Sequence, residues 1–251
     1  MDSKWLTGPD AGRDAGTRLF CLPYAGGGAA AYRDWPGALP GGTQVCPVEL
    51  PGRGRRLKEP PYSRLRPLVA ALADALRPAL DRPYALFGHS MGGLLAFELT
   101  RTLRERGLPQ PVHLFVSGAA APGTRRTRPV VHNATDAEMR GELRVLNGTP
   151  RELLENAELM ELMLPTLRAD FSVLETYTYQ EAPPLAVPLT VLAGTADPSV
   201  EISALQGWRD QTTAGSRLKL FAGDHFFLHS ATAEVIATVR EALAPGLSTA
   251  P

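Results

Sequence analysis

Six short apolar runs, each of strand length, recur along the 251-residue chain and are separated by longer, more polar segments. A strand buried on both faces reads as a continuous apolar run, which is typical of a parallel sheet covered by helices. The alternation therefore predicts an α/β fold, a mostly parallel sheet with helices on both faces. The runs are TRLFCLP (17–23), TQVCPVELP (43–51), PYALFG (83–88), VHLFVSG (112–118), PLTVLAG (188–194) and SRLKLFAG (216–223), all expected to be buried.

Helices are predicted between several of these runs. Apolar residues recur at helical spacing over residues 65–80, and a further helix closes the chain over 232–243. Another helix is expected from Gly92 to Gly107, because its last turns are rich in arginine and it ends at glycine. The polar, glycine-rich residues 1–16 are expected to be a loose tail.

Residues 124–182 interrupt the alternation, because they contain helix starts but no convincing strand. The sequences TDAE (135–138) and TPRE (149–152) are capping boxes, and Pro165 is expected to break or restart the helix that follows. Such an insertion predicts either a helical cap over the strand ends or a peripheral decoration. We expect a single domain, residues 1–251, with a lid insertion over about 124–182.

The composition argues against several functional classes. Lys and Arg total 26 and so do Asp and Glu, so net charge gives no general attraction to nucleic acid or to an anionic membrane. The N-terminus has no apolar signal region, and no run of about 18 apolar residues is present to span a membrane. Cys21 and Cys46 lie in apolar runs and indicate buried thiols rather than a metal site. We expect a cytoplasmic protein.

The sequence Gly88-His89-Ser90-Met91-Gly92 matches G-x-S-x-G. The match follows an apolar run and opens a helix, which is the setting of a nucleophile elbow. Flanking glycines leave room for a strained turn, and the helix N-terminus favours an oxyanion beside it. The alternative is that Ser90 is only a small residue in a tight turn, so its role as a nucleophile depends on partners elsewhere.

A serine hydroxyl needs a general base, and the candidates are histidines. His225 follows the last apolar run and precedes the last helix, so it belongs at the carboxyl edge of the sheet, where ligands bind in such folds. His229, one turn further on, is less well placed, and His89 in the elbow is expected to point away from the hydroxyl. His225 is the predicted base among His89, His113, His132, His225 and His229.

The acid is expected at the end of an earlier strand, in the chain order serine, acid, histidine. Asp197 meets this condition, and its alternative role is an Asx turn before the following proline. Asp224 neighbours the histidine, but adjacent side chains on a loop diverge. Asp136 and Asp170 belong to the insertion. Asp197 is therefore the predicted acid.

The loop PYAGGG (23–28) follows the first apolar run and is the predicted source of the second oxyanion donor. We assign the oxyanion hole to the backbone N–H groups of Ala25 and Met91, with Tyr24 as a candidate substrate-binding residue. The alternative is that these glycines only form a tight turn.

With these residues in place, the chain resembles the stand-alone type II thioesterases of polyketide and nonribosomal peptide assembly lines. The shared stretches cover roughly residues 17–230. They are LFCLPYAGGGAAAYRDW, VELPGRGRR, PYALFGHSMGGLLAFEL, LFVSGAAAP, GTPRELLENAELMELMLPTLRADF, ETYTY and GDHFFLH. Gly54, Asn147 and Asp224 depart from the residues usual in the family, and Asp224 is placed to modulate the basicity of the base.

The resemblance implies an α/β-hydrolase fold with a helical lid and a triad formed by Ser90, Asp197 and His225. It implies hydrolysis of acyl groups from the phosphopantetheine arm of acyl or peptidyl carrier proteins, which edits stalled or misprimed synthases. The substrate protein carries the phosphopantetheine, so no cofactor and no metal is expected. We expect a monomer that meets carrier domains transiently and has no nucleic-acid or membrane partner.

Lid residues and basic clusters are the candidates for substrate and carrier contacts. Met160 and Met163, with neighbouring leucines, either line the acyl pocket or form the lid's own core. Each basic cluster either faces an acidic carrier or is a solvated loop without a partner. The clusters are Arg53, Arg55, Arg56 and Lys58, and Arg125, Arg126 and Arg128.

Three other functions remain open at this point. A carboxylesterase or lipase shares the fold, and fold alone does not separate it from a thioesterase. A macrocyclising terminal thioesterase from a larger synthase is the second. The third is a catalytically inactive hydrolase fold used for binding, which would be expected to have lost a triad residue.

Overall fold

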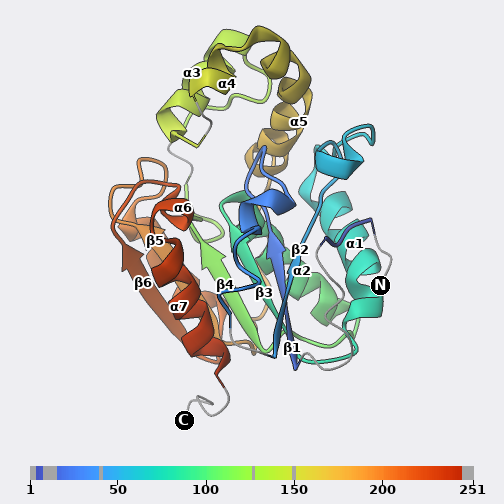
Figure 1. The fold of residues 1–251 in the computed structure, drawn as a ribbon. Helices are drawn as coiled ribbons and strands as arrows, with labels where there is room; N and C mark the ends of the chain where they lie inside the picture. Colours follow the sequence, from blue (N-terminus) through green and yellow to red (C-terminus); the bar gives the residue numbers. More distant parts are fainter. Residues whose placement is uncertain (1–3, 8–15, 40–41, 126–127, 149–150, 245–251) are drawn as a thin grey trace.

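In the part of the chain that the structure describes, six strands form one sheet in the order β2-β1-β3-β4-β5-β6, with every neighbouring pair parallel (Figure 1). The computed structural model describes residues 4–7, 16–39, 42–125, 128–148 and 151–244. All six apolar runs contain a strand, which confirms the predicted fold class. The strands are β1 (Thr17–Leu22), β2 (Thr43–Pro47), β3 (Tyr84–His89), β4 (His113–Ser117), β5 (Leu189–Gly194) and β6 (Ser216–Phe221).

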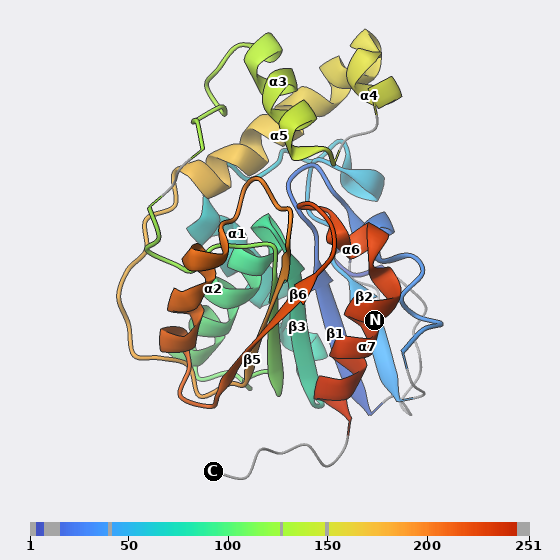
Figure 2. The same ribbon diagram turned by 90° about the vertical axis from the view of Figure 1, so that its left-hand side faces the viewer.

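Helices cover both faces of the sheet (Figure 2). The helices α1 (Leu65–Leu76) and α2 (Met91–Glu105) pack on one face, and α7 (Thr232–Leu243) packs on the other. The predicted helices are thus present, although the first ends at Leu76 and continues as a 3-10 turn. The short helices are η1 (Ala29–Tyr32), η2 (Gly54–Arg56), η3 (Arg77–Ala79), η4 (Ile202–Gln211) and α6 (Phe227–Ser230).

The strand register explains the continuous apolar runs. Leu86 of β3 lies opposite Phe20 of β1 and Leu114 of β4, and all three belong to the core beneath α1 and α2. The next residue, Phe87, belongs with Phe115 to the core on the opposite face. Because side chains alternate between faces and both faces are covered, most positions of the central strands are apolar.

The prediction of a buried strand over residues 216–223 is wrong for most of β6. Only Phe221 is buried, and Leu218 and Leu220 are each 46% exposed. β6 is the last strand in the sheet order, so it has a neighbour on one side only. An apolar run does not by itself distinguish an edge strand from a central one.

The prediction of a loose N-terminal tail is wrong for residues 4–7. Leu6 forms an antiparallel bridge with Val48, and the Thr7 N–H donates to the Pro47 carbonyl at 3.0 Å. The Trp5 ring lies 3.9 Å from the Arg56 guanidinium carbon. This cation–π contact holds the segment against the loop after β2.

Three helices between β4 and β5 form a layer above the carboxyl ends of the strands (Figure 1). They are α3 (Asp136–Leu146), α4 (Arg151–Glu155) and α5 (Ala157–Glu175). The capping box at Thr135 and Glu138 is present at the start of α3, as predicted. Thr149 and Pro150, of the second predicted capping box, lie outside the described residues.

The prediction that Pro165 breaks the helix is wrong, because α5 continues through it from Ala157 to Glu175. Proline in a helix interior costs about 3 kcal/mol and removes one backbone hydrogen bond. Pro165 lies on the exposed face of α5, while its neighbours Leu164 and Leu167 are buried in the core of the insertion. Packing on both sides of the proline therefore keeps the helix continuous.

Cys21 and Cys46 are buried thiols, as predicted. Among the described residues, no helix is both long and apolar enough to cross a bilayer.

The sheet topology brings two loops together. β1 and β3 are neighbours. After β1 the chain continues to β2 on one side of this pair, and after β3 it continues to β4 on the other side. Such a switch point opens a crevice at the carboxyl ends of the two strands. The loop after β1 carries Tyr24 and Ala25, and Ser90 follows β3 directly.

Candidate active site

Ser90 is the single residue between β3 and α2, and its backbone has a positive φ of 54°, with ψ −115°. The flanking glycines make this turn possible. A Cβ on Gly88 would lie 1.9 Å from the Gly92 carbonyl oxygen, and a Cβ on Gly92 would lie 2.2 Å from the Leu22 carbonyl oxygen. The Ser90 N–H donates to the Ser117 carbonyl at 2.7 Å. This is the strained strand-to-helix geometry of a nucleophile elbow.

His225 and Asp197 lie together, in the loops after β6 and β5. The Nδ1 atom of His225 is 2.7 Å from Oδ2 of Asp197, and the two side chains are 5% and 0% exposed. Because a carboxylate only accepts hydrogen bonds, Nδ1 carries the proton, and Nε2 is left for another partner. His225 and Ser90 line the same cavity.

The second oxygen of Asp197 is also bonded. Its Oδ1 accepts from the Ser199 backbone N–H at 2.7 Å and from the Ser199 hydroxyl at 2.6 Å. The backbone contact is the Asx turn that the sequence offered as an alternative, so Asp197 makes the turn and holds the histidine at once. Burial raises the pKa of this carboxyl, but hydrogen bonds from His225 and Ser199 outweigh burial and leave the pKa below its ordinary value of 3.8.

Ser199 is a site residue that the sequence analysis misses. Its Oγ lies 2.9 Å from Nδ1 of His225 as well as bonding Asp197, so it closes a three-residue network. The sequence Asp197-Pro198-Ser199 indicates this contact, because an Asx turn at an aspartate brings the residue two positions later back to its carboxylate.

A cavity of about 720 Å³ lies between the sheet edge and the helical insertion. Ser90, His225, Tyr24 and Ala25 contribute to its wall. A pocket of this size accommodates a ligand of small-molecule dimensions. Apolar residues from both layers complete it, among them Leu94, Ala119, Ala120, Ala121, Leu143, Leu146, Met163, Leu167, Phe171, Leu174 and Val200.

Of the two predicted oxyanion donors, Met91 follows Ser90 directly and Ala25 lines the same cavity as Ser90. Met91 is the first residue of α2, so its N–H is among the first-turn groups that have no partner within the helix. Ala25 lies in a turn closed by the Gly27 N–H, which donates to the Tyr24 carbonyl at 2.9 Å. Gly26, at the third position of this turn, has φ +73°, as a type II turn requires.

Of the three predicted substrate-binding residues, Tyr24 and Met163 line the cavity. The Tyr24 hydroxyl lies 3.1 Å from Nε2 of His229, and its ring packs edge-on against Phe226. The prediction for Met160 is wrong. Its side chain is fully buried in the core of the insertion and does not line the cavity, because it lies on the face of α5 that packs against α3 and α4.

The other histidines have partners away from Ser90. His89 is buried and its Nδ1 lies 2.8 Å from the Ser117 hydroxyl, so its side chain does point away from the elbow hydroxyl. Burial, with the nearby His225 and His229, holds its pKa well below the usual range. His113 bonds Thr190 on β5, and His132 bonds Glu175 within the insertion.

The alternative acids are engaged elsewhere. Asp224 accepts from the Asn147 side chain at 2.9 Å and from the Phe226 N–H at 2.8 Å, so both its oxygens have partners other than the His225 imidazole. Asn147 and Asp224, which both depart from the family pattern, thus bond to each other. Their contact joins the insertion to the loop after β6 that carries His225. Asp136 pairs with Arg168, and Asp170 pairs with Arg53.

The third departure, Gly54, has a steric cause. A Cβ at this position would lie 2.5 Å from Oε2 of Glu49, and Gly54 has φ +52°. An acidic side chain would meet the Glu49 carboxylate directly, so glycine is the residue that fits.

Only half of the first basic cluster is exposed to solvent. Arg53 and Arg56 are buried, at 8% and 4% exposure, and bond Asp170 and Glu59. The hypothesis that this cluster faces a carrier protein is wrong for these two arginines, because their charges are neutralised inside the protein. For Arg55 and Lys58, which are exposed, it stays a hypothesis.

In the second cluster, Arg125 is exposed at the cavity wall, and Arg128 lines the cavity and pairs with Glu142 at 2.6 Å. Arg126 lies outside the described residues.

Comparison with known proteins shows the family of the chain. Residues 17–243 match the thioesterase domain family. The chain is 44% identical to a Brevibacillus parabrevis protein named linear gramicidin dehydrogenase LgrE, over 96% of this chain and 93% of that protein. It is 42% identical to the gramicidin S biosynthesis protein GrsT of Aneurinibacillus migulanus, over 93% and 91% of the two chains.

A solved structure gives the same result. RedJ, a thioesterase from the prodiginine biosynthetic pathway in Streptomyces coelicolor, superposes with a TM-score of 0.87 and is 40% identical, over 94% of this chain and 97% of that one. The match spans the sheet, the elbow and the helical insertion. The chain is therefore a member of the thioesterase family and has the α/β-hydrolase fold.

Proposed function

We propose that the protein hydrolyses acyl thioesters carried on the phosphopantetheine arm of acyl or peptidyl carrier domains, with Ser90 as nucleophile, His225 as base and Asp197 as the acid that holds the base. The observation that carries the proposal is the contact between buried Asp197 and His225 beside a cavity that Ser90 also lines. Membership of the thioesterase family supports the choice of thioester.

The first chemical step is acylation of the serine. Nε2 of His225 takes the hydroxyl proton as Oγ of Ser90 bonds the thioester carbonyl carbon. The ionised Asp197 stabilises the imidazolium and keeps the proton on Nδ1. When the tetrahedral intermediate collapses, the C–S bond breaks and the thiol of the carrier arm leaves with the proton from His225.

The second step is hydrolysis of the acyl-enzyme. His225 takes a proton from water as the water oxygen bonds the acyl carbon, and the Ser90 C–O bond then breaks as Oγ recovers the proton. The N–H groups of Ala25 and Met91 would bind the oxyanion in both steps. Oxyanion stabilisation of this kind is worth about 10²–10³ in rate per donor.

The helical insertion is the proposed lid over this chemistry, residues 124–182. Its apolar residues form one wall of the cavity, where they would shield an acyl chain from water, and Met163 suits acyl groups of varied shape. Asn147 bonds Asp224, and Gly148 lies against the Phe226 ring, both in the loop after β6 that carries His225. The carrier arm would enter beside the exposed Arg125 and bring its thioester to Ser90.

The proposed biological role is editing of a polyketide or nonribosomal peptide synthase. GrsT is named as a gramicidin S biosynthesis protein, and BorB, at 36% identity and a TM-score of 0.86, is a type II thioesterase from the borrelidin biosynthetic cluster. A hydrolase with an apolar acyl pocket would free carrier domains blocked by an unwanted acyl group. The encounter with the carrier would be transient.

One relative is named a dehydrogenase, and the glycines after β1 match the dinucleotide fingerprint G-x-G-x-x-A over residues 26–31. That fingerprint functions where the glycines open an α-helix whose N-terminus faces a pyrophosphate. Here they precede η1, a 3-10 helix of four residues, and the Gly26 N–H donates to the Asp170 carboxylate. Both features favour an acyl-transfer site over a dinucleotide site.

The proposal is tested by comparing acyl-carrier thioesters with oxygen esters of the same acyl groups. We expect kcat/KM to favour the carrier thioester, since a thiol is a better leaving group than an alkoxide. A preference for the oxygen esters would favour a carboxylesterase, and turnover of neither would favour an inactive binding module.

A further inference from the structure

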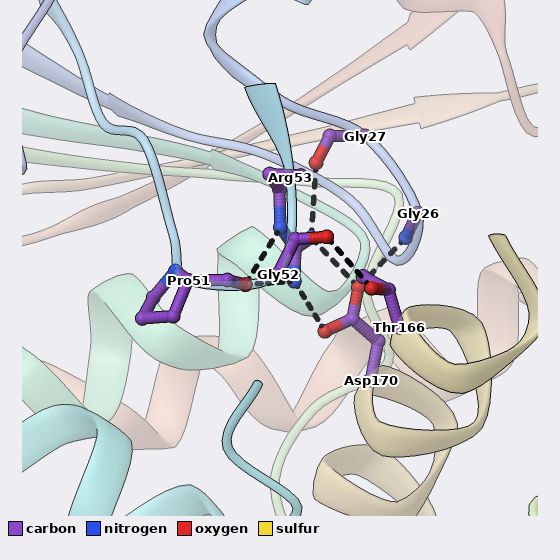
Figure 3. Close-up of polar contacts among 7 residues, drawn as sticks. All are labelled: Gly26, Gly27, Pro51, Gly52, Arg53, Thr166 and Asp170. Atoms are coloured by element: carbon purple, nitrogen blue, oxygen red, sulfur yellow. Dashed lines mark hydrogen bonds and ion pairs between the residues drawn. The ribbon is translucent and has the colours of Figure 1, made fainter. Parts of the chain in front are cut away.

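A buried ion pair joins α5 of the proposed lid to the loop after β2, beside Gly26 and Gly27 (Figure 3). Arg53, in the loop after β2, donates from Nη1 and Nη2 to the two carboxylate oxygens of Asp170 on α5, both at 2.7 Å. The side chains are 8% and 2% exposed. A bidentate pair with so little access to water is held in one geometry.

Both partners also bond the backbone of the turn. The Gly26 N–H donates to Oδ2 of Asp170 at 2.8 Å, and Arg53 Nη1 donates to the Gly27 carbonyl at 3.0 Å. The remaining guanidinium donors reach the Pro51 carbonyl, so Arg53 makes five hydrogen bonds. Five is the full donor capacity of arginine, and lysine supplies neither that number nor the planar fork.

These bonds fix the orientation of the Ala25 N–H. That N–H and the Tyr24 carbonyl belong to one planar peptide group and point in opposite directions. The Tyr24 carbonyl accepts from the Gly27 N–H, so the direction of the Ala25 N–H depends on where Gly27 sits. Arg53 and Asp170 hold Gly27 and Gly26 on either side of their common peptide bond.

The lid helix also contacts the turn sterically. A Cβ on Gly26 would lie 2.6 Å from the Leu167 side chain of α5, so the helix leaves room only for glycine. One turn before Asp170, the Thr166 hydroxyl donates to the Gly52 carbonyl at 2.7 Å (Figure 3). The segment of α5 from Thr166 to Asp170 is therefore bonded to the loop that carries Arg53.

We propose that Arg53 and Asp170 are positioning residues, which hold the Tyr24–Gly27 turn so that the Ala25 N–H faces the oxyanion formed at Ser90. This inference rests on the proposed function, because the oxyanion hole belongs to that reaction. Displacement of a reacting group by about 1 Å can lower a rate by about 10²-fold, so a small shift of the turn is enough to impair the reaction.

The test is the double variant Arg53→Met/Asp170→Leu, which replaces the ion pair by apolar side chains of similar size. Such replacements often preserve stability, whereas removing one partner leaves a buried charge unpaired. The readout is the second-order rate of Ser90 phosphonylation by an alkyl fluorophosphonate. In that reaction Ser90 Oγ bonds phosphorus, fluoride leaves, His225 takes the proton, and the phosphoryl oxygen needs the oxyanion donors.

The matched control is Arg56→Met/Glu59→Leu. Arg56 lies in the same loop and is also buried, but it bonds Glu59 and the Glu49 carbonyl instead of the turn. We expect phosphonylation to slow by about 10–100-fold in the Arg53/Asp170 variant and by less than about threefold in the control. With acyl thioester, kcat falls in the first variant while KM stays within about threefold, because the acyl pocket is unchanged.

Wild-type phosphonylation in a folded Arg53→Met/Asp170→Leu variant would overturn the inference. If that variant does not fold, Asp170→Asn is judged by the same rate, since it is nearly isosteric and loses one anionic acceptor. The proposed function fails separately: a wild-type protein that reacts with the fluorophosphonate but hydrolyses no carrier thioester sinks the thioesterase proposal and leaves the role of Arg53 and Asp170 intact.

Discussion

Oδ2 of Asp197 lies 2.7 Å from Nδ1 of His225, while the carboxylate of Asp224, the residue adjacent to His225, is bonded to Asn147 and to the Phe226 N–H. Two acids thus flank one histidine, and only the one distant in sequence contacts the imidazole. This relationship allows a direct test of which acid serves the base.

Asp197→Asn is expected to lower kcat by about 10⁴, because an amide favours the wrong tautomer of His225 and does not stabilise its charged form. Asp224→Asn is the matched control and is expected to leave kcat and the pH profile of kcat/KM within about threefold of wild type. Steady-state hydrolysis of an acyl-pantetheine thioester measures both. A large loss in the Asp224 variant, or a shift of its pH profile, would contradict the assignment.

Replacement of Ser90 by glycine is expected to stabilise the fold. A residue with a Cβ at φ 54° is strained by of order 1–3 kcal/mol, and glycine removes that strain while adding about 0.5–1 kcal/mol of unfolded-state entropy. In urea unfolding, we expect the free energy of unfolding of Ser90→Gly to exceed that of Ser90→Ala by about 1 kcal/mol. Both variants are expected to be inactive. Equal stability of the two would show that the strain does not exceed the entropy cost of glycine, about 0.5–1 kcal/mol, and would contradict the expectation.

His113 is expected to make the protein less stable in acid. Burial, with the nearby Arg217, lowers the pKa of His113 from 6.5 to about 4. Between pH 6.5 and 4, the unfolded chain binds a proton at His113 that the folded chain does not bind. The contribution of His113 to stability is therefore complete above pH 6.5 and is lost as the pH falls toward 4.

The measurement is urea unfolding of wild type and His113→Gln between pH 7 and 4. We expect the variant to lose less stability over this range, by up to about 3 kcal/mol, since one pKa unit corresponds to about 1.4 kcal/mol. His89 titrates in the same direction in both proteins, so the difference isolates His113. Identical pH dependence in the two would refute the expectation.

Arg125 is expected to contribute to recognition of an acidic carrier domain. A charge reversal at an interface rim mainly slows association and changes its salt dependence. Arg125→Glu is therefore expected to raise KM for acyl-carrier substrate by about tenfold at low salt, with little effect on acyl-pantetheine. Arg55→Glu, in the other exposed basic loop, is the control. If Arg55→Glu has the larger effect, the carrier binds on that side instead.

The elements that follow local rules could be predicted from the sequence. Central strands buried on both faces give continuous apolar runs, and the elbow needs glycine at positions 88 and 92 because the backbone leaves no room for a Cβ. The order serine, acid, histidine along successive strand ends was enough to choose Asp197 and His225. The contact between these two confirms that they lie together.

The remaining features depend on contacts that local patterns do not contain. Arg53 lies in a loop with the composition of a solvated segment, and its partner Asp170 is 117 positions away. Met160 and Met163 are three positions apart on one helix, yet one packs inside the insertion and the other lines the cavity, because the helix is covered on two sides. Similarly, Pro165 is tolerated because its neighbours pack against other helices.

The central claim is that a carrier-bound acyl group passes through an ester on Ser90. Rapid-quench mass spectrometry of the intact protein, mixed with acyl-carrier substrate, tests it most directly. The account predicts a transient mass increase equal to the acyl group, located on the peptide that contains Ser90 and absent in Ser90→Ala, which is also inactive. Undiminished hydrolysis by Ser90→Ala, or an acyl group located on another residue, would contradict it.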